Sequence, residues 1–345
     1  MLIVSVVFLA SLLIAIGSSA WFTRRLEAIC AALDWPPSLL SLLGALGANI
    51  PNYAASIVAI SGHEMEVGLG IIIGSNIYNI AIILGIVTFA VPHRDGIVLK
   101  VRMAHDVRTV ALYTLIGMFT TSCGVWLLPG TPLVSQFRAP LLFTILLTTV
   151  MVTMVALFGG LILHALRRTH YDHDESLTVP MLWRMARQKW VSAVPLRQLL
   201  IWIGEALLAL VTALGAVVVM VQSGQSLTSA LHMPQVLAGL LVLAVATSLP
   251  NTIVAFILAR TDREASCVEE IFSSNSINAT LGIALPVLFW HSVVHDQLLL
   301  WLDAPLMVVL TLAGLLCVLR RRVDRIVGAL LLLSYVAWVI VHVLV

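Results

Sequence analysis

The sequence predicts an all-α membrane protein with ten transmembrane helices, arranged as two inverted repeats of five helices each. Three observations lead to this prediction: an apolar composition, ten apolar runs of spanning length, and polar motifs that recur at a constant separation. Of the 345 residues, 60% are hydrophobic and 10% are charged, and the mean hydropathy is +1.05. Such values lie far outside the range of water-soluble domains, so we expect the function to reside within the bilayer.

Ten apolar runs are each long enough to cross the hydrocarbon core as a helix of about 20 residues. They cover residues 2–22, 38–60, 67–91, 107–129, 139–166, 198–222, 234–259, 268–291, 297–319 and 326–345. The first run has no basic residue before it and is followed by Arg24 and Arg25, so we interpret it as a retained helix rather than a signal peptide. Residues 1–166 then form the first repeat, residues 167–197 a cytoplasmic loop, and residues 198–345 the second repeat.

Lysine and arginine side chains indicate which loops face the cytoplasm, because short cytoplasmic loops are enriched in both. With ten helices, only Arg138 of the 19 lysine and arginine residues falls in an outside segment. The sequence therefore predicts a multi-pass protein of the cell (inner) membrane, with the N- and C-termini outside. Topology alone explains the basic clusters beside the helix ends, so we expect no nucleic-acid partner.

Cysteine and histidine positions give no sign of a resident cofactor. The four cysteines are scattered, without CxxC or Cys/His spacing. The HYDHDE motif at residues 170–175 lies in the hydrophilic loop, where a solvated segment is a simpler interpretation than a metal site. No Ser/His/Asp, HExxH or paired-acid arrangement appears in the sequence, so we do not expect an enzyme.

An internal repeat places a proline inside two of the apolar runs. GANIPN (residues 47–52) is matched by ATSLPN (246–251), and GSNIYN (74–79) is matched by SSNSIN (273–278). The matched Pro, Asn and Ser residues are all 199 positions apart, which indicates two copies of one unit. Helices two and three are joined by an outside loop and helices seven and eight by an inside loop, so the two copies are inverted in the membrane.

Each proline is expected to break its helix. Proline lacks an N–H and clashes with the carbonyl four residues earlier, so Pro51 frees the carbonyl of Gly47, and Pro250 frees that of Ala246. In hydrocarbon, a broken backbone is tolerated only where it packs against protein or lines a polar cavity. A cation is one suitable partner for such carbonyl groups.

Oxygen-bearing side chains gather around both prolines, because residues three or four apart share one face of a helix. The candidate ligands are Asn49, Asn52, Ser75, Asn79, Thr247, Ser248, Asn251, Ser274 and Asn278. Hydroxyl, amide and carbonyl oxygens are hard ligands that suit alkali and alkaline-earth ions. The alternative is that these residues only bond one helix to another, as is common in membrane proteins. The doubling of the whole set at one fixed spacing favours an ion path.

Residues 44–85 read GALGANIPNYAASIVAISGHEMEVGLGIIIGSNIYNIAIILG, and residues 243–284 read LAVATSLPNTIVAFILARTDREASCVEEIFSSNSINATLGIA. Both segments resemble the alpha repeats of the cation/calcium exchanger superfamily, which includes sodium/calcium and proton/calcium exchangers. The resemblance implies a sodium/calcium exchanger-like fold and a secondary antiporter, with ion sites at the membrane centre between helices two, three, seven and eight. It also implies that helices one and six slide across the other eight, and that small inorganic cations such as Na⁺ or Ca²⁺ are transported.

The resemblance also assigns roles to the candidate residues. Asn52 and Asn251 occupy the places of the family's two central glutamates. The other correspondences are Ser75 and Ser274 with hydroxyl ligands, Asn79 and Asn278 with an amide-or-acid position, Thr247 and Ser248 with a hydroxyl pair, and the carbonyls of Ala45 and Ala244 with backbone ligands. The predicted centre thus holds no carboxylate. A carboxylate beside a divalent ion contributes about 8 kcal/mol at an effective dielectric of about 20, so we expect weakened calcium binding.

Three hypotheses follow from this departure. The first is cation antiport through neutral oxygens, with selectivity shifted towards a monovalent or weakly held ion. The second is that acids elsewhere compensate: Glu205 in helix six, which could equally pair with Arg197, or Glu269 and Glu270 near the interface. The third is that the fold moves a neutral or organic solute, or has lost transport and acts as a membrane partner. Because both glutamates are replaced by the same residue, a working site with a changed substrate is favoured over decay.

Overall fold

The computed structural model describes residues 2–33, 45–92, 95–137, 139–167, 194–232, 235–261, 263–290 and 292–344. Within these ranges the chain is almost entirely helical. Most of the hydrophilic loop, including the HYDHDE motif, and the beginning of the second predicted helix lie outside the described residues.

Each half of the chain forms a series of helices, some of them interrupted by π-helical stretches. The first half contains α1 (Leu2–Ala32), α3 (Ile50–Ser61), α4 (Met65–Tyr78), η1 (Asn79–Leu84), α5 (Gly85–Ala90), α6 (Val101–Trp126), α7 (Pro132–Gln136) and α8 (Pro140–Arg167). The second half contains α10 (Leu196–Ala230), α11 (Gln235–Leu237), η3 (Ala238–Leu243), α12 (Ala244–Arg260), α13 (Glu264–Ile277), η4 (Asn278–Ala284), α14 (Leu285–Phe289), η5 (Leu299–Asp303), α15 (Ala304–Leu319) and α16 (Arg325–Leu344).

Helices of membrane-spanning length account for the predicted crossings. In the described part of the chain, nine helical segments are long and apolar enough to cross a membrane. The remaining predicted crossing, residues 38–60, is described from Ala45 onwards as a short helical segment followed by α3, which is apolar but shorter. The prediction of an all-α membrane fold is confirmed, and each predicted run is mostly helical where it is described.

The 199-residue separation between the sequence motifs also holds for the backbone. α4 begins at Met65 and α13 at Glu264, and both are 14 residues long. Each passes into a π-helical stretch at its next residue, which is Asn79 in η1 and Asn278 in η4. A π-helical turn in a membrane helix commonly marks a functional site. The two copies therefore share this irregularity as well as their sequence motifs.

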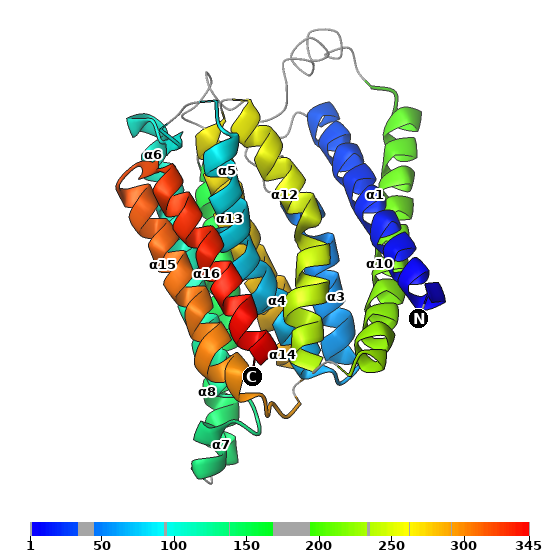
Figure 1. Cartoon of the computed structure of the whole chain (residues 1–345). Coiled ribbons are helices and arrows are strands. Elements are labelled where there is room, and N and C mark those ends of the chain that lie inside the picture. Colours follow the sequence, from blue (N-terminus) through cyan, green and yellow to red (C-terminus); the bar gives the residue numbers. More distant parts are fainter. Residues whose placement is uncertain are drawn as a thin grey trace.

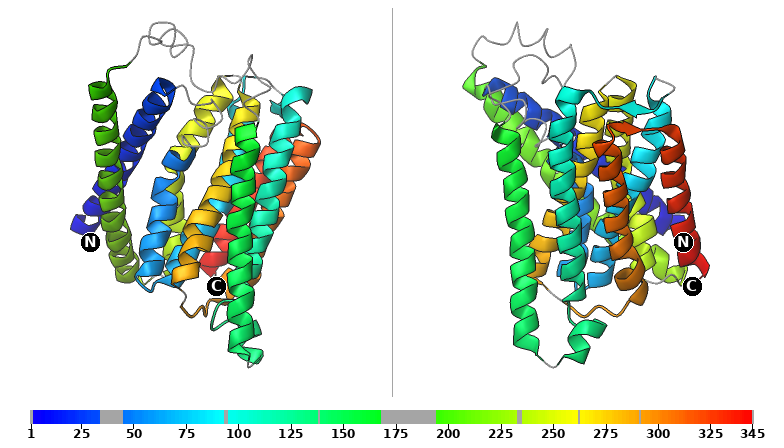
Figure 2. Two further views of the ribbon diagram at one scale, coloured as in Figure 1. Left: turned by 180° about the vertical axis from the view of Figure 1, so that it is seen from behind. Right: turned by 90° about the vertical axis from the view of Figure 1, so that its left-hand side faces the viewer.

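The helices that carry these motifs form the centre of the bundle (Figure 1). Buried residues make up 89% of the apolar window of the segment 65–90 and 78% of that of the segment 264–289, against 22% in α16. Both segments are therefore buried on most sides, although each also carries the polar side chains of the repeated motifs. The helices α1 and α10 lie together along one side of the bundle, and α6, α8 and α15 lie towards the other (Figure 2).

Two short strands were not predicted from the sequence. β1 (Ile97–Val98) pairs antiparallel with β2 (Arg322–Val323), so that Ile97 lies opposite Val323. The pair joins the segment before α6 to the turn between α15 and α16. The topology prediction places both of these segments on the same side of the membrane, which agrees with their contact.

The prediction that Pro250 breaks its helix is wrong. α12 continues through Pro250 to Arg260, and its irregularity lies earlier, in the π-helical η3. In the first copy the chain does leave the helix, but at Asn49, and Pro51 lies in the first turn of α3. Proline is tolerated there, because the first N–H groups of a helix have no partner within the helix.

Glycines let α4 and η3 approach backbone to backbone. A Cβ atom added at Gly239 would lie 2.4 Å from the Val67 carbonyl oxygen and 3.1 Å from the Gly70 Cα. A Cβ added at Gly74 would lie 2.5 Å from the Leu240 carbonyl oxygen. Small residues at such contacts are typical of tightly packed membrane helices. We call Gly70, Gly74 and Gly239 the glycine seam.

Gly239→Ala is expected to destabilise the protein by about 1–3 kcal/mol, because the new methyl group has no space against the backbone of α4. The melting temperature of the detergent-purified protein measures the effect. Gly215→Ala in α10 is the matched control, since a Cβ added there meets no atom within 4 Å. Equal melting temperatures for the two variants would contradict the close packing of the seam.

Candidate ion-binding site

The nine candidate ligands are brought together where α3, α4, η1, α12, α13 and η4 pack against one another. None of these nine residues is more than 1% exposed. Helices from both copies contribute, because α3 packs against η4 and α12 packs against α4. Polar side chains that are this deeply buried need partners, so the pattern of their hydrogen bonds shows what the site can bind.

Asn49, in the turn before α3, fixes the orientation of two other asparagines. Its amide Nδ2 donates to the Ala45 carbonyl oxygen at 2.8 Å. A carbonyl can only accept, so the Asn49 Oδ1 must face the other way. There it accepts from Asn52 Nδ2 at 3.2 Å and from Asn251 Nδ2 at 2.7 Å. The carbonyl oxygens of Asn52 and Asn251 are therefore turned away from Asn49.

Asn275 and Asn76 fix the other two asparagines of the site in the same way. Asn275 Nδ2 donates to the Asn76 carbonyl oxygen at 3.2 Å, and its Oδ1 accepts from Asn79 Nδ2 at 2.8 Å. Asn76 Nδ2 lies 3.3 Å from the Met118 sulfur, a weak acceptor, and its Oδ1 accepts from Asn278 Nδ2 at 3.3 Å. We call Asn49, Asn76 and Asn275 the anchor asparagines.

Four amide oxygens of the site accept no hydrogen bond. The Oδ1 atoms of Asn52, Asn79, Asn251 and Asn278 are buried and have no hydrogen-bond partner, whereas the amide nitrogens of all four donate within the protein. The hydroxyl oxygen of Ser248 is also buried without a partner. A buried polar atom without a partner is rare and calls for a ligand. The uneven pattern, with oxygens free and nitrogens bonded, suits a cation.

Most hydroxyl groups and backbone carbonyls of the candidate set form hydrogen bonds within the protein. Thr247 Oγ1 donates to the Leu243 carbonyl at 2.8 Å, and Ser75 Oγ lies 3.4 Å from the Ala244 carbonyl oxygen. A hydroxyl that donates still keeps lone pairs for a cation. The carbonyls of Ala45 and Ala244, predicted as backbone ligands, both accept hydrogen bonds from the protein in this structure.

Glu205 does not join this site. It forms an ion pair with Arg25 of α1, and both side chains are about one-third exposed. The pairing with Arg197 that the sequence suggested is therefore wrong, because the packing of α1 against α10 brings Arg25 closer.

Glu270 accepts a hydrogen bond from Ser274 Oγ at 2.9 Å, and its expected place near the interface stays a prediction. Ser274 belongs to the candidate set, so a carboxylate does lie at the edge of this polar centre.

A second buried polar cluster joins the end of η5 to α16. Asp303 Oδ1 accepts from Trp338 Nε1 at 2.7 Å, and His342 Nε2 lies 3.2 Å from Asp303 Oδ2. No more than 4% of any of these three residues is exposed. The cluster satisfies its own hydrogen bonds, so it needs no ligand.

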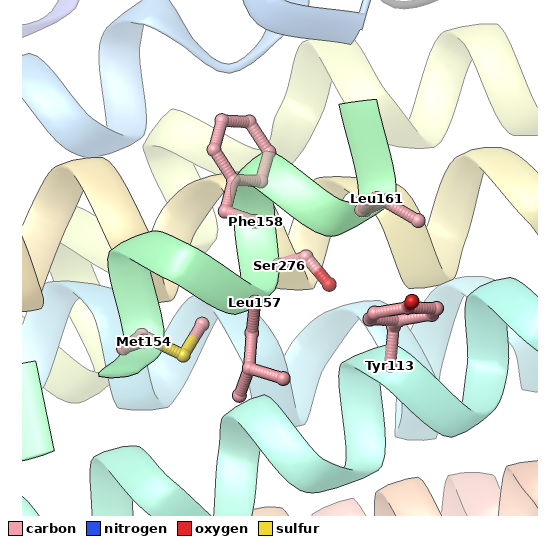
Figure 3. Close-up of a pocket in the computed structure, with 6 residues that line it drawn as sticks. All are labelled: Tyr113, Met154, Leu157, Phe158, Leu161 and Ser276. Carbon is pink, nitrogen blue, oxygen red and sulfur yellow. The ribbon is translucent and has the colours of Figure 1, made fainter. Parts of the chain in front are cut away.

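Figure 3 shows a shallow pocket between α6, α8 and α13, which is too small to hold a water molecule. It is lined by Tyr113, Met154, Leu157, Phe158, Leu161 and Ser276, and it is mainly apolar. The Ser276 hydroxyl is already bonded to Thr114 Oγ1 at 2.8 Å. None of the candidate ligands lines this pocket, so it is separate from the polar centre.

A model of the family described as "Sodium/calcium exchanger protein" matches residues 3–178 and 201–344. The chain belongs to this family. Its curated relatives include the inner membrane protein YrbG of Escherichia coli (strain K12), which is 24% identical with 98% of this chain and 96% of the relative covered. The putative antiporter CaxA of Alkalimonas amylolytica is 23% identical, with 98% of each chain covered.

Solved structures show the same fold at low sequence identity. The sodium-calcium exchanger NCX_Mj has a TM-score of 0.62 at 18% identity, over 98% of this chain and 99% of that one. The H⁺/Ca²⁺ exchanger CAX has a TM-score of 0.74 at 14% identity, over 98% of this chain and 82% of that one. The exchanger family is one of membrane transporters, so the chain is an integral multi-pass membrane protein and not an enzyme.

The anchor roles of Asn76 and Asn275 were missed in the sequence. Both residues lie inside the repeated motifs and are 199 positions apart, so the repeat did mark them. The motif does not reveal which way each amide group points. Asn275 bonds to the backbone carbonyl of Asn76, and the two residues accept from the amide nitrogens of Asn79 and Asn278, which turns the oxygens of these two side chains towards the centre.

Proposed function

We propose that this protein is a secondary active cation antiporter of the sodium/calcium exchanger type, with both termini outside. It exchanges small inorganic cations across the membrane by alternating access. Membership of the exchanger family supports antiport of cations. The uncharged Asn, Ser and Thr side chains at the centre support a selectivity shifted towards monovalent or weakly held ions.

One observation carries this proposal: four buried amide oxygens lack hydrogen-bond partners, and all four amide nitrogens are bonded. Interhelical bonding alone does not explain this pattern, because side chains that serve only to join helices use both ends of the amide. A cation between the free oxygens gives each of them the partner it lacks. Amide oxygens bind hard cations without carrying charge, so the attraction for a divalent ion is weaker than with carboxylates.

The proposal is tested by thermal stabilisation of the detergent-purified protein with chloride salts of sodium, potassium, lithium, calcium, magnesium and manganese at constant ionic strength. A ligand that binds only the folded state stabilises it by about 2.7 kcal/mol at 100 times its Kd, which raises the melting temperature. We expect one cation to stabilise the protein selectively. The same cation should drive counter-transport in proteoliposomes.

Asn251→Ala is expected to abolish this stabilisation, since the substitution removes one of the free oxygens. Thr252→Ala is the matched control: it is the next residue of α12 and bonds to the Ser248 carbonyl rather than to the anchor asparagines. If no cation stabilises the wild-type protein, cation binding is excluded. Transport of a neutral or organic solute, or a role without transport, then replaces antiport.

A further inference from the structure

Glu270 lies one helical turn before Ser274 on α13 and contacts the polar centre through it. Ser274 Oγ donates to Glu270 Oε1 at 2.9 Å and accepts from Asn49 Nδ2 at 2.9 Å. Asn49 is the anchor that orients Asn52 and Asn251. A continuous series of hydrogen bonds thus connects the Glu270 carboxylate to the residues that replace the family's two central glutamates.

The second oxygen of this carboxylate has no partner. Glu270 Oε2 is buried and accepts no hydrogen bond. In the described part of the chain, none of the ion pairs involves Glu270. Glu270 as a whole is partly exposed, but a carboxylate oxygen held away from water without a positive partner is unfavourable, and a cation beside it removes the penalty. Glu66 and Glu264, which lie near the ends of these helices, accept backbone N–H groups of neighbouring segments.

The acid is present in one copy only. The residue 199 positions before Glu270 is Ile71, which is fully buried among apolar side chains. The symmetrical part of the site is therefore neutral, and its single negative charge lies at the Ser274 end. One carboxylate balances the charge of one monovalent cation and leaves half the charge of a divalent ion without a counter-charge.

We propose that Glu270 supplies the negative charge of the ion path and makes the site selective for a monovalent inorganic cation. The inference rests on the proposed cation antiport and names its charged residue and its class of substrate. Glu270 binds the cation through Oε2, and Ser274 holds Oε1 in place. The path therefore extends along α13 from the amide oxygens to this carboxylate.

The test compares the affinities of the detergent-purified wild-type protein and three variants for sodium, potassium and lithium, measured by calorimetry. Glu270→Gln keeps the size of the side chain and an acceptor for Ser274 but removes the charge. We expect its affinity for the bound cation to fall at least about tenfold, because one close charge is lost. Glu270→Asp, which keeps the charge, should retain binding within about threefold. Glu269→Gln removes the neighbouring charge and should leave the affinity unchanged.

Infrared difference spectra give a readout that a purely structural role would not move. Adding the cation should shift a carboxylate stretching band in the wild-type protein and in Glu269→Gln, and the band should be absent in Glu270→Gln. Melting temperatures without cation show whether each variant is folded. If Glu270→Gln is not folded, the test uses Glu270→Asp.

The outcomes separate this proposal from the one on which it rests. Wild-type affinity in Glu270→Gln would overturn the role of Glu270 and leave antiport through the amide oxygens intact. Equal losses in Glu269→Gln and Glu270→Gln would overturn it too, because they would reflect the general charge of the helix end. A wild-type protein that binds none of the three cations but binds calcium would overturn the monovalent selectivity, and one that binds no cation at all would refute both proposals.

Discussion

The double substitution of Asn52 and Asn251 by glutamate is expected to create calcium affinity. Both side chains are fully buried and meet at the Oδ1 of Asn49. Two carboxylates at these positions place two negative charges around an ion held by the amide oxygens. At an effective dielectric of about 20, each contributes about 8 kcal/mol of attraction for a divalent ion at close range, part of which is offset by desolvation. We expect calcium binding to tighten by at least about a hundredfold.

The matched control is the double substitution of Asn52 and Asn251 by glutamine. Glutamine has the length of glutamate without its charge, so any gain that comes from geometry alone appears in both double variants. Calcium titration calorimetry of the purified proteins measures the difference. If the glutamate variant is folded and binds calcium no better than the glutamine variant, these two side chains do not face the ion.

Asn49→Ala is expected to abolish cation binding and to destabilise the protein even without an ion. The substitution removes the acceptor for the amide nitrogens of Asn52 and Asn251. Two buried donors are left unsatisfied, so we expect a loss of about 2–4 kcal/mol in the free energy of unfolding. Both amides are then free to turn their N–H groups towards the ion, and the affinity should fall at least about a hundredfold.

Ser248→Ala is the control for the stability loss expected in Asn49→Ala. It removes a polar side chain at the same place in the other repeat. Ser248 is the counterpart of Asn49, 199 positions later, but its hydroxyl forms no hydrogen bond. Its removal should leave the melting temperature of the ion-free protein unchanged. Denaturant or thermal unfolding of both variants provides the comparison. Equal stability losses would mean that Asn49 does not act as an anchor.

Much of the fold could be predicted from the sequence, because membrane crossings leave long apolar runs and a repeat leaves a constant separation. Met65 and Glu264, the first residues of α4 and α13, lie at the same 199-residue spacing as the prolines. The break at Pro250 was predicted wrongly, since a proline removes one hydrogen bond and crowds one carbonyl without having to end the helix, and α12 continues through it. The pair of strands that includes Ile97 and Val323 depends on contacts between distant loops, which no local pattern records.

The residues of the site could be predicted from the sequence, but the hydrogen bonds between them could not. The motif spacing identifies Asn52 and Asn251, yet whether an amide presents its oxygen or its nitrogen depends on a partner from another helix, such as Asn49. Glu270 was assigned to the interface by counting residues from the helix end. Its contact with Ser274 follows from their four-residue spacing on α13, whereas the contact of Ser274 with Asn49 depends on packing between the two halves of the protein.

The anchor asparagines also bear on which ions the site is expected to exclude. A water molecule turns its oxygen towards a cation and its hydrogens towards an anion, and it changes from one to the other freely. The amides of Asn52, Asn79, Asn251 and Asn278 cannot do so, because turning any of them breaks its bond to an anchor. The centre is thus polarised in one sense before any ion arrives. On the proposed ion path chloride would meet only the negative ends of these four dipoles, so we expect the path to reject anions whatever the direction of the membrane potential.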